Sequence, residues 1–151
     1  MGFSEVVTDG SPAATPRVGV DHSRFVQRVR RRYGDQCALL APGLPDAQRI
    51  GALIEALRAR GQPLGAALRQ ARQLTLERLA VMDVEQSASM PDIGQAMTAL
   101  AEVTLDVALA AALAEQDERH GAPLNEAGER IDFWVVGMGK LGGRELNVSS
   151  D

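Results

Sequence analysis

Residues 131–151 read IDFWVVGMGKLGGRELNVSSD, and this stretch decides which kind of fold the chain enters. It begins with an unbroken apolar run, residues 133–136, bounded by turn-forming residues and followed by glycine. Such a run is typical of a strand that is buried on both faces of a sheet. A lone strand leaves its edge hydrogen-bonding groups without partners. We therefore expect the rest of the sheet to come from residues outside these 151, so that the chain stops partway through an active site.

The sequence before this strand predicts helices. Apolar residues recur with the spacing of an amphipathic helix, for example at Ile50, Leu53, Ile54 and Leu57. Glycines and prolines mark the expected ends, and Gly34 is expected to end the first helix. The predicted helices cover residues 21–34, 45–61, 63–83 and 91–119.

The longest predicted helix has a wide apolar surface, made of two neighbouring stripes. The first stripe consists of Ile93, Met97, Leu100, Thr104, Val107, Ala111 and Ala114. The second stripe consists of Leu105, Ala108, Leu109 and Ala112. A surface this wide indicates a helix that packs on more than one neighbour.

The chain therefore divides into four parts. Residues 1–20 are rich in Gly, Ser, Pro and Thr and predict a disordered tail. Residues 21–120 form the helical region, and residues 121–130 form a connector. Residues 131–151 begin a second domain that we expect to be truncated.

Composition and charge exclude several classes. The formal net charge of -4 gives no basic face for nucleic acid. Cys37 is the only cysteine, which excludes an intrachain disulfide and favours the cytoplasm. No apolar run approaches the roughly 18–20 residues of a membrane span, so no membrane partner is expected. The N-terminus lacks the basic region and apolar core of a secretory signal.

Two groups of polar residues are weaker candidates for a site. The arginines at 28, 30, 31 and 32 could form an anion site, but a solvated face near a helix C-terminus is the favoured interpretation. His22 and His120 are the only histidines, and neither has acidic or cysteine neighbours at metal-ligand spacing. A metal role for them is therefore disfavoured.

Two familiar phosphate-binding patterns fit the glycines poorly. Gly137, Gly139 and Gly142 satisfy G-x-G-x-x-G after a strand, as in dinucleotide-binding proteins. That pattern has to open a long helix and present an acid about 20 residues later, whereas only eight residues follow the Gly-Gly pair. A Walker A loop fails at two positions, because Leu141 and Trp134 stand where Ser or Thr and the first Gly belong.

A third interpretation takes the pair Gly142 and Gly143 as the functional element. Two glycines let the backbone approach a phosphate closely, and residues 144–147 would form a short helical turn facing the anion. Asp151 would then stand at the mouth of a second strand. The competing interpretation is that the glycines only shape a tight loop and that Asp151 is an exposed terminal acid.

The glycine motif resembles the motif of one particular family, which is more specific than a general phosphate-binding turn. GMGKLGGRELNVSSD resembles the motif G-K-L-G-G-x-E-L-x-x-x-S-D-x-D-L of the bifunctional glutamine-synthetase adenylyltransferase/adenylyl-removing enzymes. The matching residues are Gly139, Lys140, Leu141, Gly142, Gly143, Glu145, Leu146, Ser150 and Asp151. The helical lead-in, residues 64–121, also resembles the segment before that motif, whereas residues 1–60 carry little that matches.

The resemblance implies a fold and an activity. The expected fold is mainly α, with a helical region leading into the first strand and Gly-Gly turn of an incomplete α+β nucleotidyltransferase domain of the polymerase-β type. The family carries two such domains: the N-terminal copy removes AMP from a tyrosine of glutamine synthetase by phosphorolysis, releasing ADP, and the C-terminal copy adds AMP from ATP. The amino-acid sequence of the motif resembles the motif of the N-terminal copy. By resemblance, the partners are glutamine synthetase and a PII-type signalling protein, and the cofactor is Mg²⁺.

The resemblance also implies roles for single residues. Asp151 would be the first carboxylate to bind magnesium, and Gly142 and Gly143 would line the phosphate site. Ser150 would orient the nucleotide, and Lys140 is either a phosphate contact or a surface lysine. The second acid of D-x-D is missing, so we expect the chain alone to have no Mg²⁺-dependent activity. The alternatives are a non-catalytic helical interaction module and, less favoured, a nicotinamide-dinucleotide-binding fragment.

Overall fold

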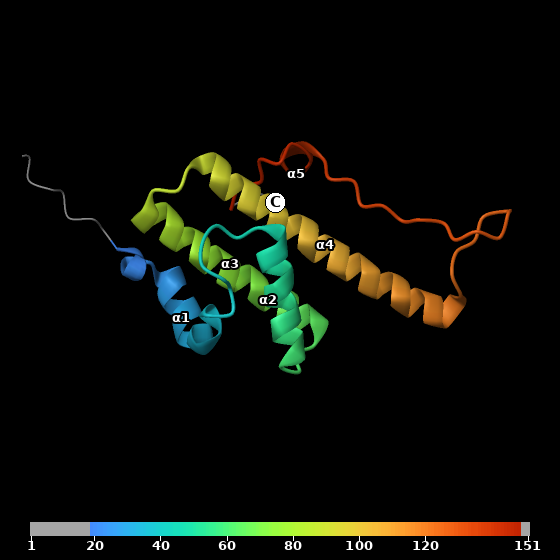
Figure 1. The fold of residues 1–151 in the computed structure, drawn as a ribbon, viewed down its shortest axis with the longest axis horizontal. Helices are drawn as coiled ribbons and strands as arrows, with labels where there is room; N and C mark the ends of the chain where they lie inside the picture. Colours follow the sequence, from blue (N-terminus) through green and yellow to red (C-terminus); the bar gives the residue numbers. More distant parts are fainter. Residues whose placement is uncertain (1–18, 149–151) are drawn as a thin grey trace, which may run out of the picture.

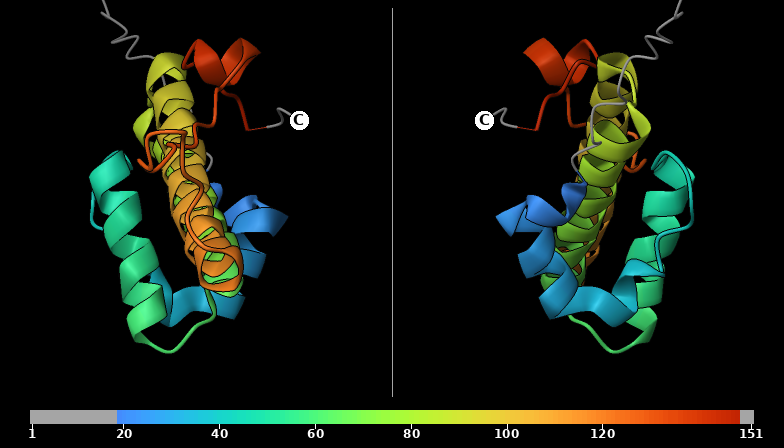
Figure 2. Two further views of the ribbon diagram at one scale, coloured as in Figure 1. Left: turned by 90° about the vertical axis from the view of Figure 1, so that its right-hand side faces the viewer. Right: turned by 90° about the vertical axis from the view of Figure 1, so that its left-hand side faces the viewer.

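A computed structural model describes residues 19–148, which form four long helices, one short helix before them and a single helical turn after them (Figure 1). In chain order the elements are η1 (Val20–His22), α1 (Arg24–Cys37), α2 (Ala47–Ala59), α3 (Leu64–Gln86), α4 (Met90–His120) and α5 (Gly139–Gly142). Helices α1 and α2 pack on α3 from different sides, and α4 contacts both α2 and α3 (Figure 2). The expected mainly α fold is confirmed.

Three of the helices begin at side-chain caps. The side chains of Ser23, Asp46 and Ser89 accept hydrogen bonds from the amide three residues further on, at 3.4, 2.8 and 3.2 Å. Each such cap typically stabilises a helix by about 1 kcal/mol. Pro45, expected in the first turn of α2, instead lies just before the cap and is fully buried.

The core lies where these helices meet. Its largest fully buried apolar residues are Leu40, Ile50, Leu53, Ile54, Leu57, Leu74, Val26 and Val29. The buried core residues of helix α4 come from its first three turns (Ile93, Ala96, Met97 and Leu100), and Val103 and Val107 are partly buried against the core. The apolar spacing in residues 45–61 and 63–83 therefore predicted the inward faces of α2 and α3 correctly.

The predicted end of α1 is wrong. The helix does not stop at Gly34 but continues to Cys37 through a kink at Tyr33, whose φ and ψ are -132° and 21°. Gly34 does not take the left-handed conformation that would end a helix. The extra turn packs Cys37 and Leu39 against the core, and this contact outweighs the local preference of glycine.

Helix α4 agrees with its predicted bounds, and it packs on more than one neighbour, as its wide apolar surface predicted. Its second half extends beyond the other helices (Figure 1). Leu105, Ala108 and Ala112 of the second stripe are exposed. Much of the second stripe is therefore exposed within residues 19–148, although the helix contacts two neighbours, α2 and α3.

Helix α4 also differs from the expectation that no apolar run is long enough to span a membrane. Among the described residues, α4 is the one helix long and apolar enough to cross a membrane, with a mean hydropathy of 1.6 over an 18-residue window. Glu102 and Asp106 interrupt the apolar run, but the surrounding alanine and leucine residues keep the average high. The composition also fits a core helix, and the first half of α4 does pack into the helical core.

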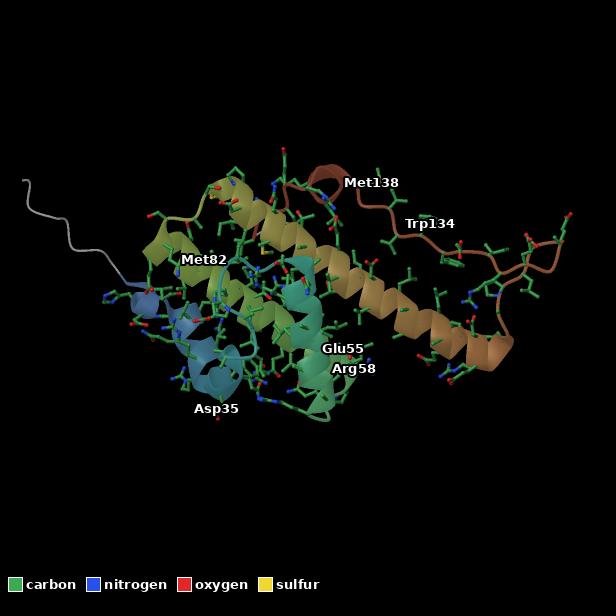
Figure 3. All side chains as sticks on the ribbon, viewed as in Figure 1. Asp35, Glu55, Arg58, Met82, Trp134 and Met138 are labelled. Atoms are coloured by element: carbon green, nitrogen blue, oxygen red, sulfur yellow. The ribbon has the colours of Figure 1, made fainter. Side chains whose placement is uncertain are left out.

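Residues 121–138 return along α4 to its N-terminal half (Figure 1). The side-chain oxygen of Asn125 closes the connector by accepting from the amides of Ala127 and Glu129, both at 2.9 Å. Residues 131–138 are extended, exposed and without a partner strand in the described part of the chain. Trp134 and Met138, labelled in Figure 3, are 80% and 83% exposed. The predicted sheet therefore stays a prediction.

Candidate functional site

The glycine motif forms a compact turn that is attached to the first half of α4. After α5 the chain contacts this helix at two points. The amide of Leu146 donates to Thr98 Oγ1 at 3.3 Å, and Nη2 of Arg144 lies 3.3 Å from Glu102 Oε1. The side chain of Leu146 also packs against the helical core. The helical region thus holds the motif in place.

The geometry of the turn explains why glycine stands at three positions. Gly139 has a φ of +56°, in the left-handed region that favours glycine. A Cβ on Gly142 would lie 2.5 Å from the carbonyl oxygen of Gly137, closer than real contacts allow. A Cβ on Gly137 would lie 3.0 Å from the side chain of Leu141. The turn itself therefore requires glycine at 142 and favours it at 137 and 139, whether or not a ligand binds.

The two amides of the Gly-Gly pair are used inside the turn. The amide of Gly142 donates to the carbonyl oxygen of Met138 at 3.3 Å, and that of Gly143 donates to Gly139 at 2.9 Å. A phosphate would therefore approach the bare backbone surface of these glycines, or the turn would change when it binds. The role of Gly142 and Gly143 in a phosphate site stays a prediction.

The predicted short helical turn is displaced. Residues 144–147 were expected to be helical, but the helical turn is formed by Gly139–Gly142 instead. Arg144 has a φ of 59°, which ends the turn. The amide of Glu145 then folds back onto the carbonyl oxygen of Lys140 at 2.8 Å. The side chain of Lys140 is exposed and makes no ion pair within residues 19–148.

The predicted metal ligand cannot be placed, because Ser150 and Asp151 lie outside the described residues. Between residues 19 and 148, no three His, Cys, Asp or Glu side chains come together in a group that could hold a metal ion. The role of Asp151 as a magnesium ligand stays a prediction.

Two features of this region were missed from the sequence. Thr98, which is 2% exposed in the middle of a helix, holds the tail through its hydroxyl group, and helical periodicity gives no signal for that contact. The tail residues 146–148 also line a cavity of about 330 Å³ between α3 and α4, together with Arg69 and Arg72. Helical periodicity alone gives no signal that brings these arginines near the motif.

Comparison with known proteins identifies the class and then the family. A family model described as glutamate-ammonia ligase adenylyltransferase matches residues 22–151, which include all of α1 to α5 and the glycine motif. This match places the chain among the nucleotidyltransferases. More narrowly, the chain belongs to the glutamate-ammonia ligase adenylyltransferase family.

Curated relatives carry the name bifunctional glutamine synthetase adenylyltransferase/adenylyl-removing enzyme. The chain is 37% identical over 150 residues to the protein from Ralstonia nicotianae, covering 93% of the chain and 16% of that relative. It is 45% identical over 147 residues to the protein from Burkholderia mallei, covering 91% of the chain and 16% of that relative. The protein from Aromatoleum aromaticum is 36% identical over 137 residues, which are 86% of the chain and 15% of that relative. No solved structure matches the chain.

Proposed function

We propose that this chain supplies the N-terminal helical region and the first part of the catalytic domain of an enzyme that removes AMP from glutamine synthetase. The observation that carries the proposal is the family match over residues 22–151, which includes the glycine motif. The relatives' names contain both adenylyltransferase and adenylyl-removing activity. The proposed role is the control of nitrogen assimilation in the cytoplasm, with glutamine synthetase as protein substrate and a PII-type signalling protein as second partner.

The proposed reaction is phosphorolysis. An oxygen of inorganic phosphate attacks the phosphorus of the AMP group on the tyrosine. The bond between that phosphorus and the phenolic oxygen breaks, the tyrosine recovers a proton, and ADP leaves. The opposite activity of the family transfers AMP from ATP to the same kind of tyrosine.

Four residues of the motif have proposed roles in binding, and one has a role in catalysis. Asp151 would hold Mg²⁺, which neutralises phosphate charge when bound. Gly142 and Gly143 would allow close approach of a phosphate, and Ser150 and Lys140 would contact the nucleotide or its phosphates. The described residues do not supply a magnesium site by themselves. We therefore derive no step through the ion.

The helical region supports this proposal as a scaffold. Thr98 and the core hold Leu146, and Asp151 follows five positions later in the sequence. Five residues reach at most about 17 Å when fully extended. In this proposal the helical region anchors the segment that leads to Asp151, and in this way a helical domain would help to position a catalytic acid.

The first experiment is to read the codons that follow Asp151 in the gene. A hydrophobic residue and then aspartate would complete the D-x-D pattern. The second experiment uses the enzyme encoded by the whole gene, with Asp151→Asn and the control Glu145→Gln. We expect Asp151→Asn to abolish phosphorolysis of adenylylated glutamine synthetase and to leave ATP-dependent adenylylation intact, while Glu145→Gln retains both activities.

The opposite pattern, with adenylylation lost and phosphorolysis kept, would assign the chain to the adenylylating half of the enzyme. The 151-residue chain by itself is expected to show no Mg²⁺-dependent phosphorolysis. Clear turnover by the purified chain would refute the role given to Asp151.

A helical interaction module is the second candidate, because a large apolar surface is exposed. It includes the second half of α4 and residues 131–138, where Phe133 and Val136 are 62% and 79% exposed. Protection of residues 139–151 from proteolysis by ATP or ADP would favour the enzyme over this module. A nicotinamide-binding domain would need a long helix after Gly142, and residues 143–148 form none.

A further inference from the structure

Four exposed arginines line a groove between α1 and α3. Arg28 and Arg32 lie one turn apart on α1, and Arg69 and Arg72 lie one turn apart on α3. Residues at these spacings project from the same face of a helix. The groove between the two pairs has a volume of about 490 Å³. We call these four residues the arginine groove.

The arginine groove has no carboxylate of its own. None of its members forms an ion pair within residues 19–148, whereas the neighbouring Arg30 binds both Asp21 and Glu77 at 2.6 Å. Arg28 and Arg32 only lie over aromatic rings of their own helix, at 5.8 and 5.2 Å from the ring centroids. Like charges one turn apart destabilise a helix. Gathering two such pairs around one groove is therefore unfavourable until an anion enters it.

A second cavity shares two of the four arginines. Arg69 and Arg72 also line the cavity of about 330 Å³ between α3 and α4. Its other walls include the apolar side chains of Leu68, Met97 and Leu100. The two guanidinium groups thus stand between a cationic groove and an apolar cavity.

We propose that the arginine groove and this cavity bind a mononucleotide. Its phosphate lies on Arg69 and Arg72, because a guanidinium group donates two parallel hydrogen bonds to phosphate oxygens. Its base lies in the apolar cavity, and both volumes fall within the usual range for small ligands, about 300–1,000 Å³. The arginine pair on α1 adds attraction for the negative charge.

The proposed nucleotide site does not include the predicted magnesium ligand. It is built from α1, α3, α4 and residues 146–148, and it needs neither Asp151 nor a metal ion. The proposal therefore does not depend on the proposed function, and its test does not measure enzymatic activity. The proposal also gives the arginines of α1 two different roles. Arg30 is a structural ion-pair partner, whereas Arg28 and Arg32 line the groove.

The test is a calorimetric titration of the purified chain with AMP, without magnesium and at low salt. Adenosine tests the apolar cavity alone, and inorganic phosphate tests the arginines alone. We expect AMP to bind at least about tenfold more tightly than either, because it uses both parts of the site. The affinity for AMP should fall as salt is added, since the contact is charged.

The decisive variant is Arg69→Ala combined with Arg72→Ala. Both side chains are exposed, so the helical core should stay intact, which circular dichroism checks. We expect the affinity for AMP to fall about tenfold or more. The matched control, Arg58→Ala with Arg60→Ala, removes two exposed arginines at the end of α2 and should change the affinity by less than about twofold. Arg58 is labelled in Figure 3.

Three results would overturn the proposal. One is the absence of AMP binding at millimolar concentration, and another is an equal loss of affinity in the control variant. The third is tighter binding of a heptaglutamate peptide than of AMP with the same dependence on Arg69 and Arg72. That result would assign the groove to an acidic protein segment instead of a nucleotide.

Discussion

The ion pair between Arg30 on α1 and Glu77 on α3 predicts an unequal response to mutation. Arg30 Nε lies 2.6 Å from Glu77 Oε1, and the side chains are 41% and 8% exposed. The hydrogen bond to Glu77 raises the pKa of Arg30, so the arginine stays charged at any ordinary pH. Arg30 is also 2.6 Å from the exposed carboxylate of Asp21. Of the two side chains, only that of Glu77 is therefore shielded from water.

Arg30→Met leaves the buried Glu77 carboxylate without its partner. An unpaired buried charge costs about 3 kcal/mol or more of the free energy of unfolding. Glu77→Met leaves a half-exposed guanidinium group that water and Asp21 still satisfy, so the expected cost is about 1 kcal/mol. The double variant removes both charges and should be less destabilised than Arg30→Met, because apolar replacement of a buried pair is often neutral.

Urea unfolding followed by circular dichroism measures these free energies. Arg31→Met is the control, because Arg31 is exposed and forms no ion pair within residues 19–148; it should change the stability by less than about 0.5 kcal/mol. If Glu77→Met cost as much as Arg30→Met, the argument from unequal burial would be refuted.

Three further predictions concern single residues. Ser87→Gly should raise the free energy of unfolding by about 0.5–1 kcal/mol, because Ser87 ends α3 in the left-handed conformation with a φ of 54°; a urea titration that shows a loss would contradict this. Thr98→Val should speed amide exchange of Leu146 by about fivefold, which NMR can measure, since it removes one hydrogen bond worth about 1 kcal/mol; unchanged exchange would show that the core alone holds the tail. Burial, and then the charge of Glu77, raise the pKa of the Cys37 thiol, so the unfolded chain ionises first and stability should fall as the pH rises above the ordinary value of 9.0; Cys37→Ala should remove this part of the pH dependence in thermal unfolding.

The helices could be predicted from the sequence because their signals are local. Apolar spacing gave the inward faces of α2, α3 and the first half of α4, and capping residues mark where helices begin. The end of α1 could not be predicted in this way. There the contact of Cys37 with the core decides the outcome over Gly34, and that contact joins parts of the chain that are far apart in sequence.

The candidate site was predictable in its motif but not in its surroundings. The spacing of Gly139, Gly142 and Gly143 identified the turn and the family. The sequence did not show that the helical turn is formed by Gly139–Gly142 and not by residues 144–147. A glycine with positive φ can begin a turn as well as end one. The approach of Arg69 and Arg72 to residues 146–148 depends on how α3 packs beside α4, which no local pattern encodes.

The glycines of this motif shape the turn in addition to their proposed role at a phosphate, and this determines which experiments are informative. Gly142 is required by the turn, since a Cβ there would lie 2.5 Å from a carbonyl oxygen. A substitution at Gly142 would therefore disturb the turn and any phosphate site together, and a loss of activity would not separate the two. Asp151 lies outside the described residues, and its proposed role is to bind Mg²⁺. Its substitution therefore tests catalysis directly, and Arg69 and Arg72 test nucleotide binding independently of both.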